Sequence, residues 1–194
     1  MILTIGGVAG SGKTSVAKIL AEKLGLTFYS MGGLRAKMAS ERGLTIDQLN
    51  VVGEEDKTTD TNVDDYQKRL GETEDNLLIE GHISWYFLPK SFKVFLTCDP
   101  KESAQRIYKA RHATEERNDE PVYESLEHTE QEIAKRKASD SLRYQKFYGV
   151  ADHQDPSHYD LVIDTTSLQG PEATASEILK VLAQKELIPV SHQP

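Results

Sequence analysis

The chain has 194 residues, of which 28% are charged, and it carries a formal net charge of −8 at pH 7 with a pI of about 5.3. This acidic balance argues against an extended nucleic-acid surface, because nonspecific phosphate binding needs an excess of Lys and Arg. The only cysteine, Cys98, excludes an intrachain disulfide and a cysteine zinc site, and it is consistent with a reducing compartment. The length suits one domain that folds without a metal or a disulfide.

The sequence shows no candidate membrane span and no targeting segment. No apolar stretch reaches the roughly 18 residues that a spanning helix needs. The first predicted strand already starts at Ile2, which leaves no room for a cleavable leader. We therefore expect a cytoplasmic protein, monomeric by default, with neither a membrane nor a nucleic-acid polymer as its partner.

The chain opens with an apolar, strand-like run at 2–6 that breaks into a glycine-rich turn closing on Lys13 and Thr14. The spacing from Gly7 to Thr14 fits G-x-x-x-x-G-K-S/T, a phosphate-binding loop whose backbone N–H groups wrap phosphates. A helix predicted at about 12–24 aims its N-terminal dipole at the same anion. The pattern predicts binding of a nucleoside triphosphate, with Lys13 as a catalytic group and Thr14 as the Mg²⁺ ligand. The residues predicted to bind this cofactor are Gly7, Val8, Ala9, Gly10, Ser11, Gly12, Lys13, Thr14 and Ser15.

Strand and helix patterns alternate through the rest of the chain. Runs rich in β-branched and aromatic residues predict further strands at 26–29, 77–80, 93–98 and 160–164. Helices are expected at about 33–42, 45–52, 62–71, 100–111, 121–148 and 171–186. Two helix-start signals support them, Thr45 with Gln48 and Asp99 before Pro100. The alternation predicts an α/β fold of the P-loop NTPase type, a three-layer α/β/α sandwich around a five-stranded parallel sheet.

Two segments interrupt this rhythm and are expected to be mobile: 33–72, which is helical throughout, and 112–120, which is polar and charged. Arginines crowd around the second segment. In an acidic protein this crowding indicates a binding site for an anionic ligand, because guanidinium groups fit phosphate oxygens and stabilise a transferring phosphoryl group. These arginines are Arg106, Arg111, Arg117, Arg136 and Arg143. The alternative is surface ion pairing with Glu115, Glu116, Glu127, Glu130 and Glu132.

The predicted strand at 77–80 ends in Glu80-Gly81-His82, at the edge of a parallel sheet where ligands bind. Glu80 is expected near metal-bound water or the acceptor, and the alternative is a carboxylate that caps the turn. His82 is a candidate phosphate or base contact, although a lone histidine after a strand is more often a hydrogen-bonding neighbour. The aromatic run at 85–87 is expected to cover the core, and the alternative is that it stacks on a base. Neither an Asn-Lys-x-Asp motif nor a strand ending in an aspartate pair occurs, which favours a small-molecule kinase over a GTPase or a motor ATPase.

With these residues the chain resembles the nucleoside monophosphate kinase family, and most closely the short cytidylate kinases of the archaeal type, over nearly its whole length. The most specific match is Arg136-Lys-Ala-Ser-Asp140-Ser-Leu-Arg143, which resembles the R-x-x-x-D-S-x-R pattern that meets the acceptor nucleotide in that family. Positions i, i+4 and i+7 share one helix face, and the alternative is an intrahelical ion-pair ladder. Further matches lie at 7–14, 30–32, 41–43, 79–81, 148–150 and 159–165.

The resemblance implies transfer of the γ-phosphoryl group of ATP to CMP or dCMP, with UMP as a secondary acceptor, by direct in-line attack with Mg²⁺. Lys13, Arg111 and Arg136 would be catalytic, and Arg106 would contact the cofactor ATP. The substrate-binding residues implied are Ser30, Gly32, Arg35, Glu80, Gly81, His82, Arg136, Asp140 and Arg143. The single kinase domain, 1–194, would comprise a core at 1–32, 73–111 and 149–194, an acceptor-binding helical segment at 33–72, and a lid with its following helix at 112–148.

The chain departs from the family pattern at three places. Ala36 stands between two basic residues where an arginine is common, and His82 replaces the arginine that usually follows the Glu-Gly pair. Arg106 and Arg111 are one residue further apart than in the pattern, so that Arg111 or Lys109 would take the second role. These departures keep two alternatives open: a phosphate-loop kinase for a different small-molecule acceptor, and a nucleotide-dependent regulatory or assembly ATPase.

Overall fold

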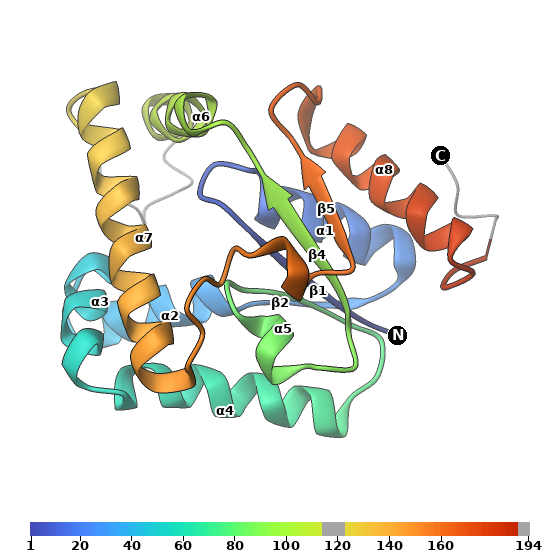
Figure 1. Cartoon of the computed structure of the whole chain (residues 1–194), viewed down its shortest axis with the longest axis horizontal. Coiled ribbons are helices and arrows are strands. Elements are labelled where there is room, and N and C mark those ends of the chain that lie inside the picture. Colours follow the sequence, from blue (N-terminus) through green and yellow to red (C-terminus); the bar gives the residue numbers. More distant parts are fainter. Residues whose placement is uncertain (114–122, 190–194) are drawn as a thin grey trace.

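Five parallel strands form the sheet in the computed structural model, which describes residues 1–113 and 123–189 (Figure 1). The strand order is β2-β3-β1-β4-β5, so the first strand lies at the centre. The strands are β1 (Ile2–Gly7), β2 (Thr27–Ser30), β3 (Leu77–Glu80), β4 (Phe92–Thr97) and β5 (Leu161–Asp164). The helices are α1 (Lys13–Leu24), α2 (Met31–Glu41), α3 (Ile46–Glu55), α4 (Thr58–Thr73), α5 (Ser84–Phe87), α6 (Pro100–Ala113), α7 (Leu126–Tyr148) and α8 (Gly170–Gln184). The expected α/β fold with a five-stranded parallel sheet is confirmed.

Helices cover both faces of the sheet because both faces are apolar. One face packs against α1 and α8, and their shared core includes Leu3, Leu20 and Ile178, which are fully buried. The other face packs against α2 and α4, where Ile79 and Leu70 are buried. Burial of this apolar surface is the main favourable contribution to folding, at about 25 cal/mol per Å².

The helix ends follow local sequence signals. Thr45 and Gln48 form a reciprocal capping box at the start of α3, with backbone to side-chain distances of 2.9 and 3.1 Å. Asp99 Oδ1 accepts two backbone N–H groups of the first turn of α6, at 2.9 and 3.1 Å. α1 ends at Gly25, whose φ of 63° is left-handed. Both predicted start signals are confirmed.

Two helices, α4 and α7, begin about one turn away from the expected position, and two short elements were not expected. α4 begins at Thr58 rather than near 62, because Asp56 accepts the Thr58 backbone N–H at 2.9 Å and the first turn buries the polar Asp60. Because the residues of this first turn are polar, they show no apolar periodicity from which the start of the helix could be predicted. α7 begins at Leu126 rather than near 121, with Ser125 as its N-cap. The short helix α5 and a 3₁₀ turn, Pro156–His158, are too short for a periodic pattern.

The carboxyl ends of the parallel strands lie at one edge of the sheet. The register pairs Ser30 with Glu80 and Thr97 with Asp164, and β1 ends between these pairs at Gly7. In Figure 1 the arrowheads of β4 and β5 point toward the end of the molecule where the β1–α1 turn lies and where α6 begins. Open parallel sheets bind their ligands at this edge.

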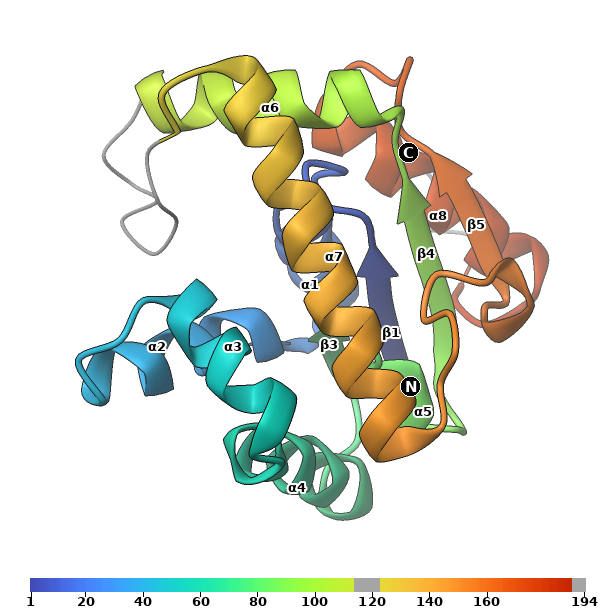
Figure 2. The ribbon, with the colours of Figure 1, turned by 60° about the vertical axis from the view of Figure 1, so that its left-hand side comes forward.

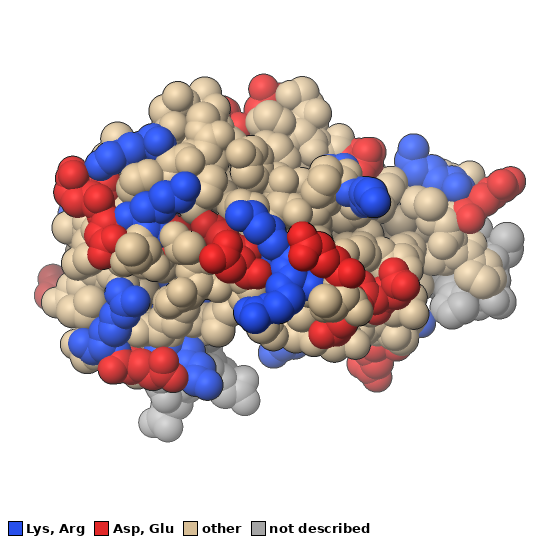
Figure 3. Space-filling model, turned by 90° about the horizontal axis from the view of Figure 1, so that it is seen from below, with Lys and Arg blue, Asp and Glu red and all other residues tan. Residues whose placement is uncertain are grey.

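Most of the predicted lid at 112–120, including Arg117, lies outside the described residues, as do Glu115 and Glu116. Within residues 1–113 and 123–189, no helix combines the length and apolar character of a membrane span. On the described part of the face seen in Figure 3, basic and acidic side chains are interspersed.

Candidate active site

The turn between β1 and α1 has the backbone of an anion cradle. Gly10 and Gly12 adopt left-handed φ values of 72° and 84°, which favour glycine. A Cβ at Gly10 would lie 2.5 Å from the carbonyl oxygen of Ser103 on α6, so a larger residue does not fit there. Gly12 is the N-cap of α1 and has no side chain to cap it. The N–H groups of the first turn of α1 can therefore serve an anionic ligand.

The cationic and hydroxyl groups of the loop lie in the same turn. Lys13 Nζ donates to the Val8 carbonyl at 3.2 Å, and Ser11 Oγ donates to the same oxygen at 2.8 Å. The Val8 N–H donates to the Leu96 carbonyl at 3.0 Å, which fastens the loop to β4. Lys13 and Thr14 are half-buried at the start of α1. The turn thus brings together backbone N–H donors, an ammonium group and hydroxyl groups. These are the groups that can bind a nucleoside triphosphate with Mg²⁺.

The ends of β2 and β3 form the neighbouring part of the edge. Ser30 Oγ donates to Glu80 Oε2 at 2.7 Å, and Glu80 is buried. Ser30 Oγ also accepts a backbone N–H of α2 at 3.1 Å, and Gly32 in that first turn is exposed. A Cβ at Gly81 would lie 2.4 Å from Ser84 Oγ, so the chain passes closely over α5 at this point.

His82 lies where the phosphate-binding loop and α7 converge. Its Nδ1 is shielded from solvent and lies 3.7 Å from Asp140 Oδ2, too far for a hydrogen bond, while 27% of the side chain is exposed. The imidazole ring lies 5.6 Å from that of His153. Burial lowers the pKa of His82 to about 3, the charges of Lys13 and Arg136 act in the same direction, and Asp140 opposes them. His82 is therefore a neutral imidazole at neutral pH.

A buried ion-pair network lies behind His82. Arg143 Nη1 donates to Asp60 Oδ1 at 2.7 Å and to Asp60 Oδ2 at 2.8 Å, and Arg143 Nη2 donates to Asp140 Oδ1. Arg35 Nη1 donates to the same Asp60 carboxylate, and Arg35 Nε donates to Asn50 Oδ1 at 3.0 Å. Burial works to lower the pKa of Arg143, but Asp140 and Asp60 raise it above its ordinary value. One carboxylate on α4 thus joins α2 to α7.

Three of the predicted acceptor contacts, Arg35, Asp140 and Arg143, belong to this ion-pair network. Arg143 is 1% exposed and Arg35 is 9% exposed, and their charged ends bind protein carboxylates. Within the R-x-x-x-D-S-x-R segment, Asp140 and Arg143 form the ion pair of the alternative interpretation. Arg136 is half-buried, and its charge acts on both His82 and Asp140. Arg35 Nη2 and Arg143 Nε are buried and have no hydrogen-bond partner within the described residues, so a direct contact of either arginine with an acceptor stays a prediction.

Sequence reasoning missed the acidic side of α4. Besides Asp60, this side carries Asp64, which accepts the Tyr148 hydroxyl through Oδ2 and the Gln67 amide through Oδ1. Burial raises the pKa of Asp64 to about 6, although the hydrogen bond from Tyr148 opposes this shift. The available signal was the spacing of two carboxylates, four residues apart, on the side of α4 that also buries Val63.

The arginines of α6 have different surroundings. Arg106 Nη2 donates to the carbonyls of Thr165 and Thr166 at 2.9 and 3.1 Å, so its guanidinium holds the loop between β5 and α8. Arg106 Nε also donates to Glu102 Oε1 at 2.9 Å. Arg111 is half-buried one turn further along. A contact of Arg106 with the cofactor, and a catalytic role for Arg111, stay predictions.

The aromatic run after β3 is only partly in the core. Phe87 is buried, whereas Tyr86 is 43% exposed. Trp85 is half-buried and stacks on His158 with ring centroids 4.0 Å apart. The expectation that this run covers the core is correct for Phe87 and wrong for Tyr86.

The chain is similar to known kinases in sequence and in fold. The sequence model of the cytidylate kinase-like family matches residues 2–167. A cytidylate kinase of Methanobrevibacter smithii is 33% identical over 182 residues, covering 94% of this chain and 98% of its own, and one of Archaeoglobus fulgidus is 35% identical over 188 residues, covering 96% and 97%. The solved shikimate kinase of Bacteroides thetaiotaomicron shares the fold with a TM-score of 0.63 at 14% identity, covering 94% of this chain and 98% of its own. The chain belongs to the cytidylate kinase-like family of nucleoside monophosphate kinases.

Proposed function

We propose that the protein transfers the γ-phosphoryl group of ATP to CMP or dCMP, with UMP as a secondary acceptor. The observation that carries this proposal is the meeting of two regions at one edge of the sheet: the left-handed backbone of the β1–α1 turn at Gly10 and Gly12, and His82, whose Nδ1 lies 3.7 Å from Asp140 Oδ2 on α7. Two sites for anions at one edge of the sheet suit a donor and an acceptor that exchange a phosphoryl group. The choice of a cytidine nucleotide rests on the archaeal relatives.

The donor side fits ATP with Mg²⁺. The left-handed backbone at Gly10 and Gly12 lets successive N–H groups approach phosphate oxygens. Lys13 would neutralise charge on the β- and γ-phosphates, and the Thr14 hydroxyl would hold the metal. Mg²⁺, when bound, supplies further neutralisation of the phosphate oxygens.

On the acceptor side, the half-buried Arg136 and the partly exposed His82 would meet the acceptor first. Ser30 and Glu80, which are hydrogen-bonded to each other at the ends of β2 and β3, would contact it next. The full set of proposed acceptor contacts remains Ser30, Gly32, Arg35, Glu80, Gly81, His82, Arg136, Asp140 and Arg143.

In the proposed reaction an oxygen of the acceptor phosphate attacks the γ-phosphorus in line, and ADP leaves. Lys13, Arg111 and Arg136 would stabilise the charge spread over the transferring group. Closure of the acceptor segment 33–72 and of the lid and following helix 112–148 over the core would exclude water, which would otherwise hydrolyse ATP. The transfer is direct, so no covalent intermediate with the enzyme forms.

The test is ADP production from Mg·ATP by the purified protein, measured with CMP, dCMP, UMP, AMP, GMP, dTMP and no acceptor. Strong stimulation by CMP or dCMP supports the proposal. Equal rates with and without every acceptor would contradict it and would favour a regulatory or assembly ATPase.

A kinase for a different small acceptor is the second candidate. The observation that favours it is the neutral imidazole of His82, at a position where the related pattern carries a permanent charge. Turnover with a non-nucleotide acceptor, and with none of the six nucleotides, would decide for this candidate.

We also propose that the protein acts as a monomer in the cytoplasm. The free, buried Cys98 suits a reducing compartment. Light scattering coupled to gel filtration tests the oligomeric state against the chain mass of 21.7 kDa.

A further inference from the structure

The first turn of α6 contacts the tip of the phosphate-binding loop. Ser103 Oγ donates a hydrogen bond to the Ala9 carbonyl, and Ser103 is 3% exposed. A Cβ at Gly10 would lie 2.5 Å from the Ser103 carbonyl oxygen, so the two backbones are in close contact. The loop tip therefore cannot shift toward α6, and the Ser103 hydroxyl holds it from moving away.

The same two turns of α6 also hold the loop between β5 and α8. Arg106 donates to the Thr165 hydroxyl at 3.3 Å, in addition to the carbonyls of Thr165 and Thr166 at 2.9 and 3.1 Å. The Asp99 N–H, just before α6, donates to Thr166 Oγ1 at 2.8 Å. Because Arg106 uses a planar guanidinium on two successive carbonyls, it fixes both the position and the direction of this loop.

Ser103 and Arg106 are three residues apart and therefore lie on one side of α6. The loops that they hold follow β1 and β5, which flank β4 in the sheet. A rigid helix with one contact to each loop sets the distance between the loops.

This distance concerns the donor nucleotide. Two of the proposed acceptor contacts, Ser30 and Glu80, lie at the ends of β2 and β3, on one side of β1. With the acceptor on that side, the other side, across the ends of β4 and β5, is left for the nucleoside of a nucleotide whose phosphates lie in the β1–α1 turn. We propose that Ser103 and Arg106 are positioning residues that hold the two donor-site loops at the spacing that a nucleoside triphosphate requires. This inference rests on the proposed use of ATP.

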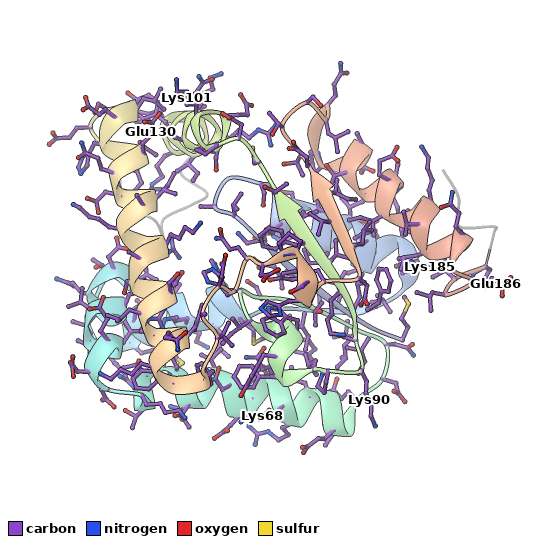
Figure 4. All side chains as sticks on the ribbon, viewed as in Figure 1. Lys68, Lys90, Lys101, Glu130, Lys185 and Glu186 are labelled. Atoms are coloured by element: carbon purple, nitrogen blue, oxygen red, sulfur yellow. The ribbon has the colours of Figure 1, made fainter. Side chains whose placement is uncertain are left out.

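The first test measures nucleotide affinity without any acceptor. Calorimetric titration of Mg·ATP and of Mg·ADP into Ser103→Ala should give Kd values raised roughly three- to tenfold, as expected when one positioned hydrogen bond is lost. Ser103→Thr, which keeps the hydroxyl, should restore the affinity. Lys101→Ala is the matched control, because Lys101 lies exposed on the outer side of the same turns (Figure 4).

Arg106 allows positioning to be separated from direct contact with the γ-phosphate. Arg106→Lys keeps the charge but replaces three donor nitrogens with one, so it cannot hold Glu102, the Thr165 hydroxyl and the two carbonyls at once and should weaken ATP and ADP by the same factor. A loss confined to ATP would mean that Arg106 touches the γ-phosphate, and it would overturn the positioning role for this residue.

Hydrogen exchange supplies a second measurement that needs no nucleotide. Ser103→Ala should speed amide exchange in the β1–α1 turn, and Arg106→Lys should speed it in the loop after β5. Unchanged affinity and unchanged exchange in both variants would overturn the inference. If the unmodified protein itself binds no Mg·ATP, while the variants still show faster exchange, the proposed function fails and the loop contacts stand.

Discussion

Both carboxylate oxygens of Asp60 accept hydrogen bonds from Arg143 Nη1, at 2.7 and 2.8 Å. The same carboxylate also accepts a hydrogen bond from Arg35 on α2. A single buried residue of α4 therefore connects α2, α4 and α7. A second contact, from Ser139 Oγ on α7 to Glu54 Oε1 on α3 at 2.6 Å, strengthens this junction. Figure 2 shows α7 running along the helical segment that contains α3. The expected acceptor segment is therefore fastened to α7 rather than attached only through the sheet.

The Asp60 junction predicts a large loss of stability in Asp60→Asn. The variant leaves two buried guanidinium groups without their shared carboxylate, and the free energy of unfolding should fall by about 3 kcal/mol or more. Urea denaturation followed by circular dichroism measures this change. Asp65→Asn is the control on the same helix, since Asp65 is 62% exposed and should cost less than about 0.5 kcal/mol. Equal, small effects of both substitutions would show that the junction does not stabilise the fold.

Asp64 predicts a pH-dependent contribution to stability. Burial raises its pKa from 3.8 to about 6, so the folded state holds this proton more tightly than the unfolded state. The favourable contribution is fully present below pH 3.8 and is lost as the pH rises through about 6. Asp64→Asn cannot titrate, so its unfolding free energy relative to the unmodified protein should improve by roughly 2 to 2.5 kcal/mol between pH 4 and pH 8. Unfolding curves at both pH values check this, and a constant difference would contradict it.

Lys13→Ala should strongly reduce phosphoryl transfer while the fold is kept. Lys13 is half-buried and its Nζ lies against the loop carbonyl of Val8, so its removal opens no core cavity. Loss of one preorganised cation should lower kcat by roughly 10² to 10³. The control is Lys18→Ala, an exposed position on α1. An unchanged kcat in Lys13→Ala would show that Lys13 of the phosphate-binding loop has no part in phosphoryl transfer.

Arg136→Ala should impair use of the acceptor more than use of ATP. The Arg136 charge acts on His82 and Asp140 at the acceptor side. Loss of a charged hydrogen bond should raise the KM for CMP about tenfold or more. Steady-state kinetics with each substrate varied in turn measures both constants, and an unchanged KM for CMP would exclude Arg136 from the acceptor site.

His82→Arg should lower the KM for CMP. The imidazole is neutral at neutral pH because burial brings its pKa to about 3, whereas a guanidinium stays charged. Asp140, 3.7 Å from Nδ1, offers a carboxylate partner that allows the larger cation to be accommodated. No change in KM would place His82 outside the acceptor pocket.

The parts of the protein that the sequence determined by itself are those encoded by neighbouring residues. The phosphate-binding loop follows from Gly7 to Thr14, and each strand follows from a short apolar run, because backbone conformation and burial pattern depend on residues close in the chain. The capping box of Thr45 and Gln48 is local in the same way. These elements therefore agree with the sequence-based expectations.

Only the tertiary structure decided which charged groups meet. Asp60 and Arg143 are 83 positions apart, and Ser103 lies 94 positions from Ala9, so no local pattern encodes either contact. From the sequence, Arg35 and Arg143 are expected to contact the acceptor nucleotide, and folding also brings a carboxylate of α4 between them. Burying two guanidinium groups without a counter-charge would cost several kcal/mol, and packing α2, α4 and α7 together supplies that charge from a helix whose sequence shows only polar residues at this turn.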